Sequence, residues 1–198
     1  MRIGVYGGAF DPPHLAHVSL AQHAVAQLHL DLLIVLPTGS AWHKTRELTQ
    51  AVHRIAMAQM AFSSLPKLRV DARETQRSGR TYTIDTLEQL QTEHVGAQLF
   101  LLMGQDQFEA FASWYRWQDI ACLATICIAA RAANTPTCLE NHAPSEVQTQ
   151  CKIASINMPD MPISATDIRQ RVKAGQRIDH LVKPEVAKYI AHHSLYIA

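Results

Sequence analysis

The sequence of 198 residues lacks a strong excess of charge of either sign. It has 18 lysines and arginines against 17 aspartates and glutamates, which leaves a formal net charge of +1. Proteins that bind nucleic acids or anionic membranes usually carry broad basic surfaces, so the balance argues against both partners. An anionic ligand is therefore expected to be bound locally, by a few residues.

Long apolar runs and paired cysteines are also missing. No apolar stretch approaches the length of a membrane span, and no signal peptide is recognisable at the start of the sequence. The four cysteines show neither a C-x-x-C pair nor another metal-like spacing. We therefore expect a cytoplasmic protein with reduced thiols, folded as a single domain over residues 1–198.

Short apolar runs alternate along the chain with helix-like stretches. The runs are residues 3–6, 32–36, 68–70, 98–103 and 124–129. This alternation predicts parallel βαβ units, and hence an α/β fold with a Rossmann-like, doubly wound, mostly parallel sheet and helices on both faces. Ser164 and Pro184 are typical helix starts, which predicts a helical C-terminal segment over about residues 164–198.

The loop after the first apolar run has the residue types that bind phosphate. It lacks the G-x-G-x-x-G pattern of dehydrogenase domains, which argues against that cofactor site. Gly7 and Gly8 would let a phosphate approach backbone N–H groups. His14 and His17, at the start of a helix, can point to one side and donate hydrogen bonds to phosphate oxygens. The alternative is an ordinary turn with two surface histidines.

Two motifs resemble the signature of the nucleotidyltransferase superfamily. The segment Gly7–His17 is similar to the strand, Gly-x-Phe-Asp-Pro turn and H-x-x-H pair of that superfamily, and residues 163–169 are similar to its I-S-S/T-T-x-I-R element. Hydroxyls at Ser164 and Thr166, together with the Arg169 guanidinium, suit the β- and γ-phosphates of a nucleoside triphosphate. The alternative for this second motif is simple capping of a helix.

Three further segments resemble the bacterial nicotinate-nucleotide adenylyltransferase family. They are residues 37–44, which end in a His-Lys pair; residues 80–87, similar to an S-Y-T-x-D-T-L element; and residues 104–117, similar to a G-x-D segment and an aromatic loop. Lys44 of the first segment could reach a phosphate. In that family the backbone of the second segment is associated with the nicotinate carboxylate. In the third, an aromatic side chain stacks on the pyridine ring and the Asp approaches a ribose. Without the resemblance, the aromatic side chains would be read as core, Asp106 and Asp85 as helix-start residues and Lys44 as a solvated charge.

The resemblance implies a set of site residues. ATP would contact Gly7, Gly8, Ala9, Phe10, His17, Gly104, Asp106, Ile163, Ser164, Thr166 and Arg169. The mononucleotide would contact Lys44, Tyr82, Thr83, Asp85, Trp114 and Tyr115. Catalysis would depend on His14, His17, Lys44 and Arg169. Ala9 and Ala16 depart from the usual Ser/Thr and Gly of the first motif, and Ala165 departs from a hydroxyl residue in the second.

The implied reaction is adenylyl transfer from ATP to nicotinate mononucleotide, with Mg²⁺ carried mainly by ATP and no metal site built by the protein. The implied partners are thus ATP and nicotinate mononucleotide, without nucleic acid or membrane. Three alternatives stay open: an adenylyltransferase acting on nicotinamide mononucleotide, one acting on phosphopantetheine, and a nucleotide-binding regulator without turnover. The sequence does not decide whether the protein forms a homo-oligomer.

Overall fold

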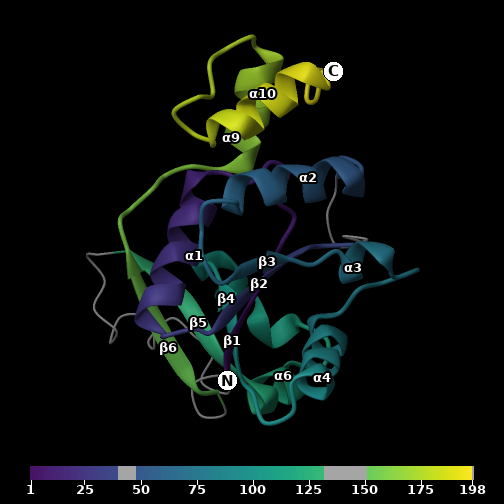
Figure 1. Ribbon diagram of the computed structural model, residues 1–198, viewed down its shortest axis with the longest axis vertical. Coiled ribbons are helices and arrows are strands. Elements are labelled where there is room, and N and C mark those ends of the chain that lie inside the picture. The colour runs from purple at the N-terminus through teal and green to yellow at the C-terminus, as the bar shows by residue number, and fades with distance from the viewer. Residues whose placement is uncertain (40–47, 132–150, 198) are drawn as a thin grey trace.

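The computed structural model describes residues 1–39, 48–131 and 151–197, whose strands form one six-stranded sheet (Figure 1). The strands are β1 (Arg2–Gly8), β2 (Leu32–Pro37), β3 (Leu68–Val70), β4 (Gln98–Met103), β5 (Ala124–Arg131) and β6 (Ile153–Met158). Their order in the sheet is β3-β2-β1-β4-β5-β6, and every neighbouring pair is parallel. The predicted α/β class is confirmed.

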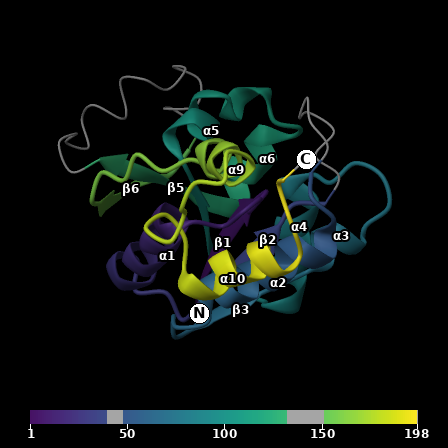
Figure 2. The same ribbon diagram turned by 90° about the horizontal axis from the view of Figure 1, so that it is seen from above.

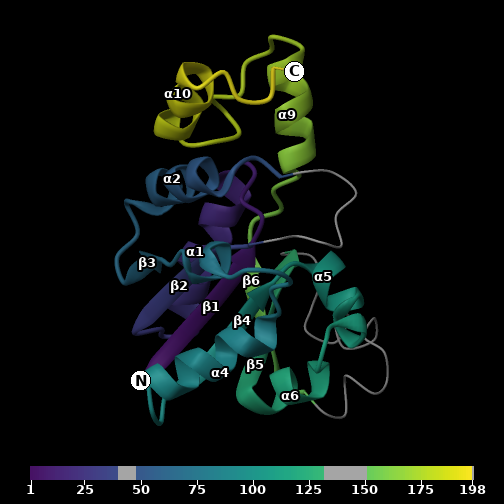
Figure 3. The same cartoon turned by 90° about the vertical axis from the view of Figure 1, so that its right-hand side faces the viewer.

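Helices connect the strands and cover both faces of the sheet. They are α1 (Leu15–Gln27), α2 (Ala51–Phe62), α3 (Arg73–Gln76), α4 (Thr83–Glu93), α5 (Gln105–Glu109), the 3₁₀ turn η1 (Phe111–Ser113), α6 (Trp117–Leu123), α9 (Ala165–Lys173) and α10 (Pro184–His192). Helices α1, α2, α9 and α10 share one core with the sheet, and α4, α5 and α6 share the other. Figure 3 shows α4 and α6 below the sheet, α5 beside its upper end, and α2, α9 and α10 above it.

The two cores follow from the alternation of side chains along each strand. In β1, Tyr6 faces the core that includes α1 and α2, whereas Ile3 and Val5 face the core that includes α4. Because both faces are covered, the central strands are apolar on both sides, which gives the continuous apolar runs seen in the sequence. Leu33 and Ile34, neighbours in β2, are both fully buried, one in each core.

The C-terminal helices lie beyond α2 at one end of the molecule (Figures 1 and 2). Ser164 is the N-cap of α9, where its side-chain oxygen accepts a hydrogen bond from the backbone N–H of Asp167 at 3.1 Å. Pro184 is the first residue of α10. Both predicted helix starts are confirmed, and Val186 and Ile190 of α10 are buried in the core shared with α1 and α2.

The sequence analysis did not predict the edge strand β6 or the short helices α3, α5 and α6. In β6 only Ile156 is buried, and Ser155 and Asn157 interrupt the apolar pattern, so the run does not resemble the central strands. Helices of four to seven residues contain too few turns to show a 3.6-residue period. Within the described ranges, no helix is both long and apolar enough to cross a membrane.

The strand order reverses between β1 and β4, since β2 and β3 extend from one side of this pair and β5 and β6 from the other. In open parallel sheets ligands bind beyond the carboxyl ends of the strands at such a point. The carboxyl end of β1 is Gly8 and that of β4 is Met103. The fold therefore directs attention to the loops that follow these two residues.

Replacement of Ile34 by alanine tests the account of the central strands. The side chain of Ile34 is fully buried in β2, so we expect the cavity left behind to lower the free energy of unfolding by about 2–5 kcal/mol. Val95→Ala is the control, because Val95 is 90% exposed and should change stability by less than about 0.5 kcal/mol. Urea unfolding of both variants measures the difference, and equal stabilities would contradict the assignment.

Candidate active site

A cavity of about 770 Å³ lies at the carboxyl ends of β1 and β4. Most of its lining comes from four segments: the end of β1 with the loop into α1, helix α1 itself, the start of α5, and the stretch from β6 into α9. Ala129 of β5 also lines it. Every residue predicted to contact ATP lines this cavity, as does His14. The lining residues that were not predicted as sites include Asp11, Gln105, Gln107 and Asp160.

The turn after β1 is shaped by contacts of the Phe10 ring. Phe10 has a positive φ of 47° and is 1% exposed, with its ring edge-on to Tyr6 and Phe62. A Cβ on Gly8 would meet that ring at 2.9 Å, whereas a Cβ on Gly7 would meet nothing within 4 Å. Gly8 therefore makes room for the ring, and Gly7 leaves the backbone open on the cavity side.

His14 and His17 stand together at the start of α1. His14 is the N-cap residue, and the two rings stack with centroids 3.6 Å apart. Nδ1 of His17 accepts a hydrogen bond from the backbone N–H of His14 at 3.1 Å. Because an accepting nitrogen carries no proton, the neutral ring of His17 holds its proton on Nε2. His17 is thus fixed as a hydrogen-bond donor beside the cavity.

Burial keeps His14 uncharged. Its side chain is 7% exposed, and loss of hydration lowers the pKa of His14 from 6.5 to about 4. Its Nδ1 is one of three buried side-chain polar atoms that have no hydrogen-bond partner in the described part of the chain. A second, Oε1 of Gln105, belongs to the same cavity lining. Buried polar groups normally have partners, so these two atoms are available to bond to a group that enters the cavity.

The second motif lines the same cavity. Nη2 of Arg169 donates to Oγ1 of Thr166 at 3.0 Å, and Nη1 donates to the backbone carbonyl of Asp11 at 2.8 Å. The N-terminus of α9, which Ser164 caps, lies in the same lining. The structure thus brings together two motifs that lie about 150 residues apart in the sequence, as their common resemblance implied.

A buried arginine that the sequence analysis missed binds the backbone of the turn after β1. Arg54 of α2 is 3% exposed and donates to the carbonyls of Ala9 and Thr49 at 3.0 and 2.8 Å. It occupies a position of the apolar stripe that continues with Met57, Ala58 and Ala61. An arginine at an apolar position was the sequence signal that could have revealed this contact, because a buried guanidinium needs hydrogen-bond acceptors.

The predicted pyridine-binding residues lie away from this cavity lining. Tyr115 is 56% exposed and its ring lies 4.5 Å from that of Tyr82, measured between centroids. Thr83 is the first residue of α4. Trp114 packs in part against the core, 5.6 Å from Phe111, and Asp85 faces a separate surface hollow with Asp71 and Arg73. Lys44 lies outside the described residues.

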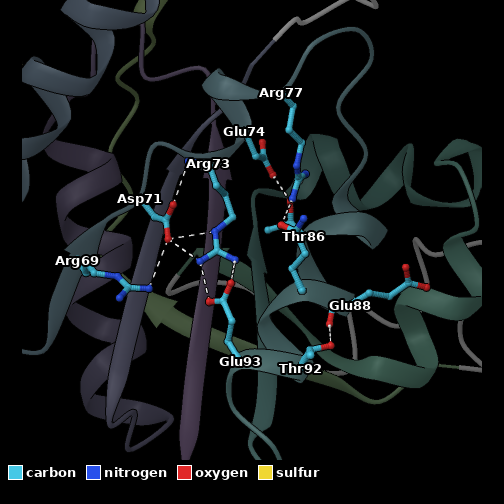
Figure 4. Close-up of polar contacts among 10 residues, drawn as sticks. Arg69, Asp71, Arg73, Glu74, Arg77, Thr86, Glu88, Thr92 and Glu93 are labelled. Carbon is cyan, nitrogen blue, oxygen red and sulfur yellow. Dashed lines mark hydrogen bonds and ion pairs between the residues drawn. The ribbon is translucent and has the colours of Figure 1, made fainter.

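A buried network fixes the start of α4 (Figure 4). Thr86 donates to Oε1 of Glu74 at 2.8 Å and accepts from Nη1 of Arg77 at 2.8 Å. Burial raises the pKa of Glu74, although the hydrogen bond from Thr86 opposes the shift.

A Cβ on Gly39 would meet the backbone oxygen of Glu74 at 2.1 Å, so only glycine allows the loop after β2 to approach α3. The hydroxyl of Thr81, the third buried atom without a partner, lies beside it.

Comparison with known proteins places this arrangement among the nucleotidyltransferases. A family model described as cytidylyltransferase-like matches residues 5–171. Two solved structures of the Plasmodium falciparum nicotinic acid mononucleotide adenylyltransferase, complexed with APC and with NaAD, align with TM-scores of 0.78 and 0.76 at 21% and 20% identity. Each alignment covers 98% of this chain, and 96% and 97% of the respective solved chains. At this identity the likeness establishes the fold.

Curated relatives identify a particular family among the nucleotidyltransferases. Proteins named "Probable nicotinate-nucleotide adenylyltransferase" from Albidiferax ferrireducens and Methylibium petroleiphilum are 49% and 38% identical to this chain. Both alignments cover 98% of this chain, and they cover 98% and 92% of the relatives. The chain belongs to the nicotinate-nucleotide adenylyltransferase family.

The depressed pKa of His14 predicts a loss of stability in acid. The unfolded chain binds a proton near pH 6.5 and the folded chain only near pH 4, so stability falls as the pH drops through this window, by on the order of 3 kcal/mol. His14→Gln, which does not titrate, should remove that part of the slope. Urea unfolding from pH 7 to pH 4 measures both proteins, and identical slopes would contradict the burial of a neutral His14.

Proposed function

We propose that this protein transfers the adenylyl group of ATP to nicotinate mononucleotide, which gives deamido-NAD and pyrophosphate. The observation that carries the proposal is the cavity at the β1/β4 switch point, which is lined both by the start of α1 with His17 and by α9 with Arg169. Relatives with 49% and 38% identity over nearly their whole length carry the name of this activity.

The chemistry requires orientation and charge stabilisation more than a strong base. A phosphate oxygen of the mononucleotide forms a bond to the α-phosphorus of ATP, and the bond from that phosphorus to the bridging oxygen of pyrophosphate breaks. The attacking phosphate is already ionised at neutral pH, so no protein nucleophile is needed. Donors aimed at the oxygens that gain charge provide the catalysis.

His17 is the best-placed donor for the α-phosphate. Its Nε2 carries the proton because Nδ1 is occupied by the backbone N–H of His14. His14 adds a neutral ring with an unpartnered nitrogen. On the other wall Arg169 and the N-terminus of α9 would hold the β- and γ-phosphates. The proposed role of Lys44 rests on the resemblance alone.

Mg²⁺ would enter with the triphosphate and neutralise part of its charge. In the residues that the structure describes, no group of three His, Cys, Asp or Glu side chains could hold a metal ion. The carboxylates of Asp106 and Asp160 line the cavity and are oxygen ligands of the type that Mg²⁺ prefers. These features suit an ion held chiefly by phosphate oxygens and water.

The mononucleotide would bind toward α4 and the aromatic loop. Tyr115 offers exposed ring surface for stacking on a pyridine, beside the half-buried ring of Tyr82. The N-terminus of α4 at Thr83 presents backbone N–H groups suited to a carboxylate. A carboxylate on the ring is what distinguishes nicotinate from nicotinamide, so these N–H groups would favour the acid.

The first test follows pyrophosphate release with Mg²⁺-ATP and one acceptor at a time. We expect release with nicotinate mononucleotide and much less with nicotinamide mononucleotide, phosphopantetheine or riboflavin phosphate. Release with phosphopantetheine alone would overturn the acceptor assignment. Binding of ATP without turnover on any acceptor would instead support a regulator.

His17→Ala tests the catalytic donor. Loss of a donor to the transition state should lower kcat about 100-fold or more, with little change in Tm because His17 borders the cavity. His23→Ala is the matched control, since His23 lies on the same helix, its ring bonds to Ser19, and it lies outside the cavity lining. Comparable turnover in the two variants would remove His17 from the mechanism.

Tyr115→Ala tests the acceptor end separately. Stacking of an aromatic side chain on a base contributes on the order of 1–3 kcal/mol, so we expect the KM for nicotinate mononucleotide to rise by about tenfold. The KM for ATP should stay the same, because Tyr115 lies outside the cavity lining. Its exposure means that stability should hardly change. A rise in the KM for ATP alone would contradict the placement of the two substrates.

A further inference from the structure

The C-terminal end of the chain reaches the turn that carries the first motif. The hydroxyl of Tyr196, which follows α10, donates a hydrogen bond to Oδ1 of Asp11 at 2.6 Å. The two residues lie 185 positions apart in the sequence. A second hydrogen bond also links the C-terminal segment to the first motif. The backbone N–H of Leu15, the first residue of α1, donates to the carbonyl of Leu181 at 2.9 Å.

Asp11 connects four parts of the structure. Its Oδ2 accepts from the backbone N–H of Thr49, just before α2, at 3.2 Å. Its backbone carbonyl accepts from Arg169 of α9 at 2.8 Å. With Tyr196 on Oδ1, the residue therefore links the turn after β1 to α2, to α9 and to the C-terminal end. It also lines the cavity itself.

The hydrogen bond from Tyr196 is important for Asp11 because the carboxylate is buried. Asp11 is 1% exposed, so water cannot replace a missing donor without entering the structure. Burial and the charge of Asp11 both raise the pKa of the Tyr196 phenol, which stays protonated and can donate at any physiological pH. A hydrogen bond to a buried carboxylate is among the stronger ones in proteins.

We propose that Tyr196 is a positioning residue for ATP: its phenol holds Asp11, and Asp11 holds the turn from Phe10 to His14 and the Arg169 guanidinium in the arrangement that receives the triphosphate. The proposal rests on the proposed function for the identity of the ligand. Tyr196 itself would touch neither substrate. Its loss should therefore affect the binding of ATP and leave the binding of the mononucleotide unchanged.

Tyr196→Phe removes the donor and keeps the ring. We expect a roughly tenfold weaker affinity for Mg²⁺ with α,β-methylene-ATP, measured by calorimetry, and a similar rise in the KM for ATP at an unchanged KM for nicotinate mononucleotide. Tyr189→Phe is the matched control, because Tyr189 in the same C-terminal segment also bonds through its hydroxyl, to Nδ1 of His53 at 3.0 Å, outside the cavity lining. It should also lower Tm, because it removes a hydrogen bond, and leave the affinity for the analogue intact.

The partner of Tyr196 is tested by repeating the substitution in an Asp11→Asn background. If Tyr196 acts through the Asp11 carboxylate, Tyr196→Phe should weaken binding of the analogue by less than twofold there. An equal loss in both backgrounds, or a Tyr196→Phe variant that binds the analogue as tightly as Tyr189→Phe, would overturn the proposal.

Failure of this proposal and failure of the proposed function give different results. Analogue binding needs no acceptor, so a wild-type protein that binds the analogue but releases no pyrophosphate with nicotinate mononucleotide would refute only the acceptor. A Tyr196→Phe variant with unchanged analogue binding would refute only the role of Tyr196.

Discussion

The candidate site depends on the burial of one carboxylate, that of Asp11. A buried charge is costly unless donors surround it, and the donors here come from the segment before α2 and from the C-terminal end, while α9 bonds to the same residue's carbonyl. These segments lie far apart in the sequence. Satisfying Asp11 therefore fixes the two walls of the cavity relative to each other, and His14, three residues further on, begins α1 from that fixed point.

The rest of the site follows from helix ends placed at a strand switch point. The N-termini of α1 and α9 border the same cavity, at the carboxyl ends of β1 and β4. Exposed N–H groups at such ends attract phosphate. The neutral ring of His14 and the ring of His17, whose Nδ1 accepts from the backbone, lie beside them in the cavity lining. Under the proposed function, the protein would thus offer a triphosphate oriented dipoles and the Arg169 guanidinium, where a basic surface would attract many anions.

The sequence predicted the central strands and the motifs of the candidate site better than the buried contacts that hold them in place. The central strands and the ATP motifs could be predicted because apolar runs, a Gly-Gly turn and an H-x-x-H pair are local patterns. The partners of Asp11, the buried Arg54 and the Glu74–Thr86 bond could not, since each joins residues that only the fold brings together. Residue type also did not predict which aromatic side chains of residues 114–117 are buried. Trp117 is 7% exposed in the core, whereas nearby Tyr115 is 56% exposed.

The central claim is that His17 presents a protonated Nε2 to a triphosphate. Nitrogen-15 NMR of the histidine rings, with and without Mg²⁺ and α,β-methylene-ATP, tests it most directly. The account predicts that the proton of neutral His17 is on Nε2 before the analogue is added, that this signal shifts on binding, and that the His23 ring does not respond. A proton on Nδ1 of His17, or a saturating analogue that leaves the Nε2 signal unchanged, would contradict it.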